Sequence, residues 1–294
     1  MDLEPTADQL ALVEELRRAL DSNATWGALV DMGVLSLPVP EADGGVGLGW
    51  TDAVLAFQAL GHACVEGPFV TTAAATAAGI AEGVTGVAPD GVPALVEHLD
   101  RLDSLLVLGD DGIRRVPLPL AGARRLDRPM DPGTPVHIFD GTLTGETVAD
   151  AATAREVRRH AALLAAAMQV GLGAAAVEIA TAYAQQRQQF GRPIGSFQAL
   201  KHLLADAAVG LEVARAAVDA AAVMEDEGDA RVERGVAAAR IVASGAAEQA
   251  TRACIQVHGG MGYTWELGVH VHHKRVLALD LVPMTVEDAI SVMA

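Results

Sequence analysis

The stretch Tyr183-Ala-Gln-Gln-Arg-Gln-Gln-Phe-Gly-Arg-Pro-Ile-Gly-Ser-Phe-Gln198 interrupts the most regular part of this sequence. Pro193 and Gly195 break helices, and Ser196 is a favourable N-cap, so one helix should end here and another begin. Apolar residues recur at helical spacing on both sides of the stretch. We therefore predict long helices over residues 153–189, 197–225, 229–257 and 265–279. Long helices joined by short loops are typical of a four-helix bundle.

Residues 84–150, before the bundle, have a different texture. Gly, Pro and Asp are frequent there, and short apolar runs lie between them. The runs at Ser104–Leu108, Val136–Phe139 and Thr142–Thr144 predict strands separated by turns. This segment is short for a complete β domain, so we expect a reduced one.

Residues 1–83 are helical again. Thr6 is a candidate N-cap for helices within 6–33. Thr51 is a candidate N-cap for a helix that runs through Leu60, and a further helix is predicted over 71–81. The Pro- and Gly-rich segment 35–49 predicts a loop between them. We thus expect a mainly α protein with an α-helical N-terminal domain (1–83), a reduced β domain (84–150) and a C-terminal helical bundle (151–294).

Composition narrows the class of protein. The chain has 294 residues, of which 51% are hydrophobic and 3% aromatic, so its core consists mainly of aliphatic side chains. Its net charge of −17 repels phosphate backbones and argues against nucleic-acid binding. The N-terminus shows no signal-peptide pattern, and two cysteines without metal-like spacing suit a reducing cytoplasm. The uncharged stretch 161–177 is rich in Ala and Gly, which favours a buried bundle helix over a membrane span. We expect a cytoplasmic protein without membrane contact.

Two segments contain candidate ligand-binding residues. The first is the stretch quoted above, and the second is Gln256-Val-His-Gly-Gly-Met-Gly-Tyr-Thr-Trp-Glu266. Arg187 is placed at a helix C-terminus, where it offsets the dipole or makes a forked contact to a phosphate. Gly259 and Gly260 leave a bare backbone that a flat or phosphorylated ligand can approach. Gln256 lies one helical turn before Gly260. Taken singly, the arginine is also explained as a cap and the glycines as a turn. The Gly260-Met-Gly262 sequence is not a dinucleotide fingerprint.

Together the two segments resemble the acyl-CoA dehydrogenase family. The family's Arg-x-x-Phe-Gly-x-Pro-Ile…Phe-Gln…Ala-Asp box matches Arg187, Phe190, Gly191, Pro193, Ile194, Phe197, Gln198, Ala205 and Asp206. Its Gln-x-x-Gly-Gly-x-Gly-Tyr/Phe box matches Gln256, Gly259, Gly260, Gly262 and Tyr263. The loop that begins at Pro38 is similar to the family's Pro-Glu-x-x-Gly-Gly-x-Gly segment.

The resemblance implies a helical N-terminal domain, a β barrel and a C-terminal four-helix bundle. It also implies FAD, bound across a subunit interface. The residues to which the resemblance assigns FAD contacts are Arg187, Phe190, Gln198, Gln256, Gly259 and Gly260.

The sequence departs from the family at the catalytic base. The reaction removes an α proton from an acyl thioester, which needs a positioned carboxylate. One group of the family places its glutamate shortly after the Gly-Gly turn, and here that position falls at Pro283-Met-Thr285. Another group places it on the first bundle helix, where this chain has Ala161. The family's Thr-Glu-Pro…Gly-Ser-Asp and Trp-x-x-Asn-Gly strands, which hold the flavin ring and the thioester, are also not found. We assign no catalytic residue to this chain.

Other groups offer alternatives. Glu266, Asp280 and Glu287 are the acids nearest the usual base position. In the alternative that this chain has a relocated base, that base is one of these three. His270, His272 and His273 cluster, but 272 lies on a different helical face and no Cys or carboxylate completes a site, so we expect no metal.

The chain resembles the two-gene enzymes of bacterial steroid catabolism, in which unlike subunits share FAD sites. This resemblance implies a homologous partner subunit that carries the catalytic glutamate, an acyl-CoA substrate and an electron-transfer flavoprotein. Two rivals stay open. One is an active homo-oligomeric dehydrogenase with a relocated base, and the other is a flavin-free structural pseudoenzyme.

Overall fold

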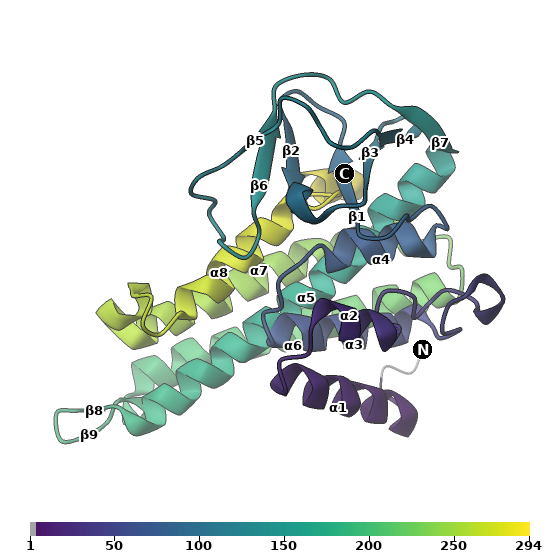
Figure 1. The fold of residues 1–294 in the computed structure, drawn as a ribbon. Coiled ribbons are helices and arrows are strands. Elements are labelled where there is room, and N and C mark those ends of the chain that lie inside the picture. The colour runs from purple at the N-terminus through teal and green to yellow at the C-terminus, as the bar shows by residue number, and fades with distance from the viewer. Residues whose placement is uncertain (1–3) are drawn as a thin grey trace.

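The computed structural model describes residues 4–294. Their helices and strands form a long helical bundle, a small β region above it and an N-terminal helical layer below it (Figure 1). The mainly helical architecture expected from the sequence, with N-terminal helices, a small β region and a C-terminal helical bundle, is confirmed. The N-terminal helices are α1 (Ala7–Asp21), α2 (Trp26–Asp31), α3 (Trp50–His62) and α4 (Phe69–Ala77), and the short 3-10 helix η1 (Glu41–Asp43) lies within the predicted loop.

The caps of the N-terminal helices were predicted with mixed success. Thr6 caps α1 as expected, in a reciprocal capping box with Gln9. Thr51 was expected to cap α3, and this is wrong. The helix begins one residue earlier, and the carboxylate of Asp226 accepts hydrogen bonds from the backbone N–H groups of Trp50 and Thr51. The first turn of α3 is therefore capped by a residue from the end of a bundle helix.

The β region contains two small sheets. The first has the order β1-β3-β4-β7, from β1 (Thr85–Pro89), β3 (Ser104–Leu108), β4 (Gly112–Val116) and β7 (Glu146–Asp150). Its β1 and β3 are parallel, and the other neighbours are antiparallel. The second has the order β2-β6-β5, from β2 (Ala94–Glu97), β6 (Val136–Phe139) and β5 (Arg124–Arg125). The 3-10 helix η2 (Leu99–Arg101) follows β2.

Two of the three predicted strands are confirmed, at 104–108 and 136–139. The third is wrong, because residues 142–144 form no strand and β7 begins at Glu146. Leu143 instead packs into the small core between the sheets, where it is 1% exposed. This short apolar run therefore packs into the core without pairing as a β-strand.

The bundle consists of α5 (Ala151–Gln186), α6 (Gln198–Asp226), α7 (Val232–His258) and α8 (Val269–Ala278), followed by α9 (Val286–Met293). Between them lie the β8–β9 hairpin (Gln188–Gln189 and Arg192–Pro193) and the 3-10 helices η3 (Ile194–Ser196), η4 (Gly259–Tyr263) and η5 (Leu279–Leu281). The sequence did not predict α9, although Thr285 and Asp288 form its capping box. Ser196 does not cap α6. Its hydroxyl donates to the carbonyl of Pro193 inside η3.

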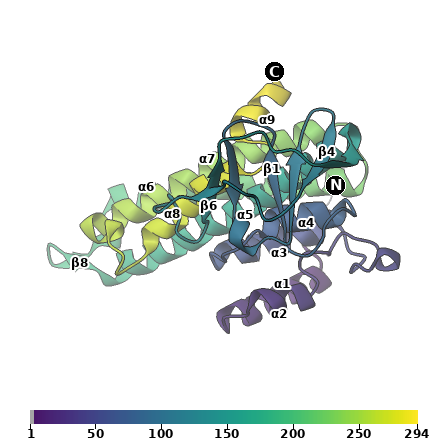
Figure 2. The same ribbon diagram turned by 45° about the horizontal axis from the view of Figure 1, so that its top comes forward.

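Helix α5 runs through the centre of the molecule, between α3 on one side and α6 and α7 on the other (Figures 1 and 2). The close approach of α3 requires glycine at the crossing, since a Cβ on Gly61 would meet the carbonyl of Met168 and one on Gly171 would meet that of Gln58. Among residues 4–294, α5 is the helix long and apolar enough to cross a membrane, but 78% of its apolar window is buried in the protein. It is the core helix of the bundle.

Candidate functional site

The two segments singled out in the sequence meet at one end of the bundle, far from the β region (Figures 1 and 2). Tyr183 on the last turns of α5 stacks on His258 at the end of α7, with ring centroids 4.2 Å apart. A small apolar cluster below them joins α5, η3, α7 and α8. Its members include Ala184, Ile194 and Ile255. This packing joins the ends of α5 and α7, from which the chain continues into the β8–β9 hairpin and the Gly-Gly turn respectively.

Arg187 is the C-cap residue of α5, as predicted. Its backbone N–H donates to the carbonyl of Tyr183, and its own carbonyl accepts from Ile194. Its side chain is exposed and makes no hydrogen bond or ion pair with any residue in the described range 4–294. A cation held at a fixed backbone position without a partner is available to an anionic ligand.

Phe190 stands at the tip of the hairpin. Its φ of 52° lies in the left-handed region, which is unusual for a bulky residue, and its side chain is 91% exposed. The ring makes an edge contact with Phe197, 6.2 Å away between centroids. A strained backbone that presents an apolar ring to water indicates a surface that another molecule covers.

The Gly-Gly turn offers bare backbone on its outer side. Gly259 has φ 58° and ψ −138°, a conformation open essentially to glycine alone. A Cβ built on Gly259 or Gly260 meets no atom within 4 Å, so neither glycine is needed for packing within the chain. Gly262 differs, because a Cβ there would lie 2.6 Å from the carbonyl oxygen of Ile255. Two of the three glycines thus leave open space where a ligand or partner can approach.

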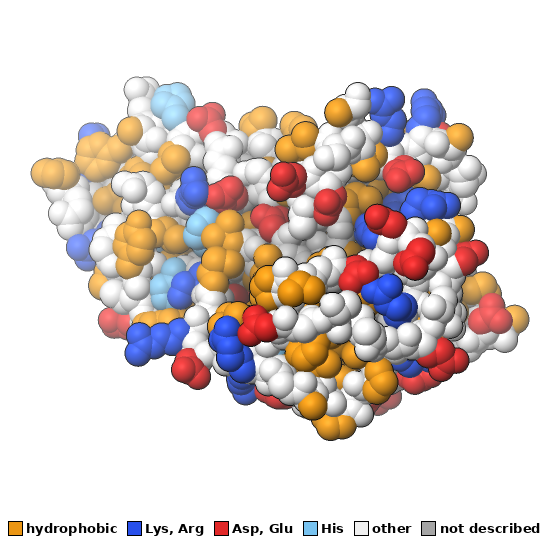
Figure 3. Space-filling view, turned by 90° about the horizontal axis from the view of Figure 1, so that it is seen from above, with side chains coloured by type: hydrophobic (Ala, Val, Ile, Leu, Met, Phe, Trp, Pro, Cys, Tyr) orange, Lys and Arg blue, Asp and Glu red, His pale blue; other side chains and the backbone are white. Residues whose placement is uncertain are grey.

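Gln256 and Gln198 complete the set inferred from the resemblance. Both are exposed at this end of the molecule, on the last turn of α7 and the first turn of α6. Exposed apolar side chains surround the turn, and we call them, with Phe190, the apolar end. They are Met261, Tyr263, Trp265 and Leu267. Viewed from above, apolar side chains gather at this end, on the left of Figure 3, whereas acidic side chains gather over the other half.

The residues at this end fit the outer part of an FAD. The free guanidinium of Arg187 suits a pyrophosphate, and the open face of Gly259 and Gly260 allows close approach of a flat or phosphorylated group. Phe190 supplies an apolar ring beside them.

Residues 283–285, where one branch of the family places its catalytic base, connect η5 to α9 in this chain. Pro283 and Met284 are buried, and Met284 has φ 65°. Thr285 is the N-cap of α9 and accepts a hydrogen bond from the backbone N–H of Asp288. The other base position, Ala161, is fully buried within α5. Pro283 and Ala161 line none of the cavities given for residues 4–294, whereas Met284 lines one of about 690 Å³ between the β region and the bundle.

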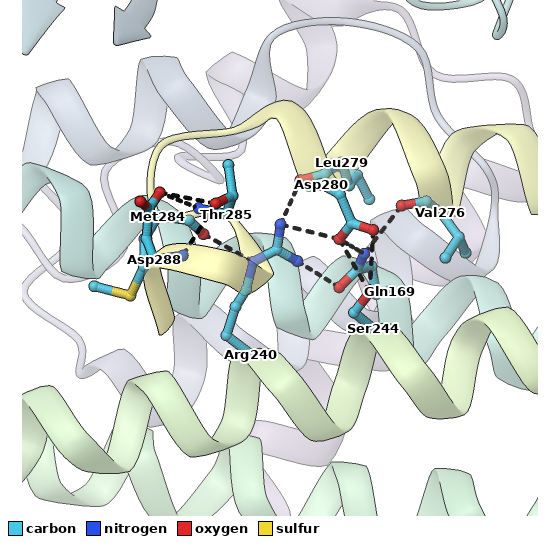
Figure 4. A network of polar contacts seen from close by, with 9 residues as sticks. All are labelled: Gln169, Arg240, Ser244, Val276, Leu279, Asp280, Met284, Thr285 and Asp288. Carbon is cyan, nitrogen blue, oxygen red and sulfur yellow. Dashed lines mark hydrogen bonds and ion pairs between the residues drawn. The ribbon is translucent and has the colours of Figure 1, made fainter. Parts of the chain in front are cut away.

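A buried arginine fixes this connection (Figure 4). Arg240 on α7 is 0% exposed and donates to the carbonyls of Met284 and Leu279, at 3.2 and 2.6 Å. It also donates to the side chain of Gln169 on α5, 2.6 Å away. Burial lowers the pKa of Arg240 to about 10, and the charge of Asp280 opposes that effect. The guanidinium stays charged at neutral pH and holds both ends of the 279–284 segment.

Asp280, one of the three alternative bases, belongs to this network. Its carboxylate accepts from Ser244 at 3.0 and 3.1 Å and from Gln169 at 2.9 Å, and it lies 3.3 Å from the guanidinium of Arg240. Asp280 is thus the counter-ion of a buried arginine. Glu266 lies exposed in the loop before α8, and Glu287 lies exposed on the first turn of α9. Neither lines a cavity given for residues 4–294.

The clustered histidines separate in the structure. His270 contacts the edge of Trp265, and His273 is hydrogen-bonded to Thr251 at 3.0 Å. Within residues 4–294, no three His, Cys, Asp or Glu side chains come together as a metal site.

A second polar cluster, which was not predicted from the sequence, lies where the β region meets the bundle. Glu97, His98 and Arg275 line a cavity of about 30 Å³, whose wall also includes Leu279 and Val282, just before the family's base position. No local pattern revealed it, because its members come from segments far apart in the sequence. The cavity has room for about two water molecules and none for an acyl thioester.

The chain belongs to the acyl-CoA dehydrogenase family, whose members use FAD. Residues 2–85 match the family's N-terminal domain and residues 151–282 match its C-terminal domain. The chain is 33% identical to acyl-CoA dehydrogenase IpdE2 of Mycobacterium tuberculosis over 92% of this chain and 85% of that protein. It is 27% identical to FadE28 of the same organism, over 94% of this chain and 93% of that protein.

Solved structures share the fold. The crystal structure of the ChsE4-ChsE5 complex from Mycobacterium tuberculosis has a TM-score of 0.82 at 21% identity, covering 100% of this chain and 98% of that one. The Tcur3481-Tcur3483 steroid ACAD has a TM-score of 0.83 at 20% identity, covering 97% and 96%.

Proposed function

We propose that this chain is the catalytically incomplete subunit of a heteromeric, FAD-dependent acyl-CoA dehydrogenase. A homologous partner subunit supplies the catalytic glutamate and most of the acyl-CoA site. This chain supplies Arg187, Phe190, Gln198, Gln256, Gly259 and Gly260 to the pyrophosphate and adenine side of the shared FAD. The electrons leave through an electron-transfer flavoprotein. The three domains proposed are residues 1–83, 84–150 and 151–294.

One observation carries this proposal. The residues inferred to contact FAD are exposed, and the side chains of Arg187, Gln198 and Gln256 have no hydrogen-bond or ion-pair partner within residues 4–294, whereas the base position is buried and fixed by Arg240. Exposed cofactor-binding residues together with a buried base position suit a chain that completes the active site of another subunit. A dehydrogenase of this branch that works without a partner needs a carboxylate at position 283 that faces a substrate cavity.

The comparisons support the heteromeric arrangement and the substrate class. One structural neighbour is a complex of two differently named proteins, and another is described as a steroid ACAD. We infer an acyl-CoA derived from a steroid as the substrate, dehydrogenated between its α and β carbons.

Co-expression with a homologous dehydrogenase subunit that carries the catalytic glutamate tests the proposal. We expect the chain alone to be colourless and to self-associate through its apolar end, because exposed apolar surface of this kind is normally covered. The co-purified pair should be yellow, form a defined heteromer by light scattering and dehydrogenate acyl-CoA. A yellow, active homo-oligomer of this chain alone would overturn the proposal. A colourless heteromer would favour a structural pseudoenzyme.

A further inference from the structure

The polar cavity between the β region and the bundle is built from three parts of the chain. Arg275 on α8 is 3% exposed and donates through Nε to Asp131, in the loop before β6, and through Nη1 to the carbonyls of Cys64 and Val65. Asp131 is 1% exposed and also accepts from the backbone N–H of Gly133, at 3.1 Å. This ion pair joins α8 to the β region and to the loop before α4.

Three atoms of this cluster are buried without a hydrogen-bond partner among the described residues 4–294. They are Oε1 of Glu97, Nδ1 of His98 and Nη2 of Arg275, which lies 4.0 Å from Glu66 and is not hydrogen-bonded to it. All three residues line the cavity of about 30 Å³. Buried polar atoms are almost always satisfied, and an unsatisfied one costs about 1–3 kcal/mol. A polar cavity of this size holds about two water molecules, each of which needs two to four polar partners.

We propose that this cavity holds ordered water bridging Glu97, His98 and Arg275, and that Glu97 is the group through which the junction binds and releases a proton. The chemistry of the three atoms matches water, which accepts from a guanidinium N–H and donates to a carboxylate oxygen and to an imidazole nitrogen. An apolar occupant would leave all three unsatisfied.

Burial singles out Glu97 as the group of this cluster whose pKa lies near neutrality. Burial raises the pKa of Glu97 to about 7, with Asp131 adding to the effect and Arg275 opposing it. Burial lowers the pKa of His98 to about 4 and raises that of the Cys64 thiol to about 11, so both are uncharged over the neutral range. The titratable and charged groups that face the cluster from the surrounding elements are Cys64, Glu66, His98, Arg101, Asp131 and Arg275.

The consequence is a junction that weakens as pH rises. A carboxyl whose pKa is raised on folding stabilises the native state fully below its unfolded pKa of 4.5, and that contribution is lost as pH rises through 7. A shift from 4.5 to about 7 corresponds to about a 300-fold change in the unfolding equilibrium constant. Above that range, the ionised Glu97 lies beside Asp131 with Arg275 as their shared counter-ion.

The test measures urea unfolding of the assembled protein from pH 5 to 8.5, for wild type, Glu97→Gln and the control Glu66→Gln. Glu66 belongs to the same cluster but its side chain is 66% exposed. We expect wild type and Glu66→Gln to lose stability over this range by about 75-fold in the unfolding constant relative to Glu97→Gln. Identical pH profiles for wild type and Glu97→Gln would overturn the proposal.

Two further measurements on the wild-type protein do not depend on how the variant folds. Carboxyl ¹³C NMR of Glu97 should titrate with a midpoint near 7, and a midpoint near the ordinary value of 4.5 would refute its role in proton binding. A high-resolution crystal structure should show water density between Glu97, His98 and Arg275. A dry cavity would overturn the hydration part of the proposal.

Discussion

Replacing Gly260 by alanine adds one methyl group to a surface that is open in this chain. Gly260 does not lie in the left-handed region, and its Cβ would meet no atom within 4 Å. The isolated chain should therefore tolerate Gly260→Ala, with a change in stability within about 0.5 kcal/mol, as for other surface positions. The methyl group becomes costly only if a ligand packs against this backbone in the assembled enzyme.

The expected cost follows from overpacking. A methyl group forced into a filled contact costs about 1–3 kcal/mol, which corresponds to roughly a 5- to 150-fold loss of affinity. On dilution, we expect the heteromer carrying Gly260→Ala to release FAD at a protein concentration higher than wild type does, by the same factor as the loss of affinity. The measurement is the recovery of free-flavin fluorescence as the purified complex is diluted, compared with wild type.

Gly245→Ala is the matched control. Gly245 is an exposed glycine within α7 whose Cβ also meets no atom within 4 Å. There the substitution should stabilise the helix by about 0.5–1 kcal/mol and leave FAD retention unchanged. Equal FAD retention in wild type and Gly260→Ala would show that no ligand covers this turn and would refute its place in the FAD site.

Three further substitutions probe the cofactor end, the fixed connection and the bundle. Arg187→Ala should weaken FAD binding in the heteromer by roughly ten- to a hundred-fold, because a charge-assisted contact to a pyrophosphate contributes about 1.5–3 kcal/mol; an unchanged dilution profile would contradict this. Asp280→Asn should lower the free energy of unfolding by about 3–5 kcal/mol, because it leaves Arg240 buried without its counter-ion. Turnover per bound FAD should stay within a few-fold of wild type. Loss of turnover with stability intact would instead make Asp280 a base. Although burial raises the pKa of Glu225, hydrogen bonds from its neighbours, including Arg159, lower it to about 2. Its contribution of about 3 kcal/mol is therefore present above pH 4.5 and lost between pH 4.5 and 2, and urea unfolding of Glu225→Gln should show a flatter acid profile.

The sequence predicted the parts of the fold that depend on local pattern. The long helices follow from uninterrupted apolar periodicity, and the breaks at Pro193 and at the Gly-Gly turn fall where the helices end. Arg187 was placed correctly at a helix C-terminus for the same reason. Which residues contact FAD stays a prediction, since the resemblance alone assigns those roles.

The features that escaped prediction depend on residues far apart in the chain. Asp226 caps α3 from the end of α6, so no window around Thr51 could show that Thr51 is not the cap. Arg240 fixes a segment about forty residues away, and Glu97 meets Arg275 only through packing of the β region on α8. The capping box at Thr285 was the exception, because Thr-x-x-Asp is a local signal for α9 that the sequence already carries.

The central claim is that the partner's glutamate, and no carboxylate of this chain, removes the substrate proton. Rapid mixing of the heteromer with acyl-CoA tests it directly, by following loss of the flavin absorbance in a single turnover. We expect the Glu266→Gln, Glu287→Gln double variant of this chain to bleach within a few-fold of the wild-type rate, and a Glu→Gln change of the partner's base to slow bleaching by about 10²–10⁴-fold. A drop of about a thousand-fold in the double variant of this chain, with FAD still bound, would contradict the account.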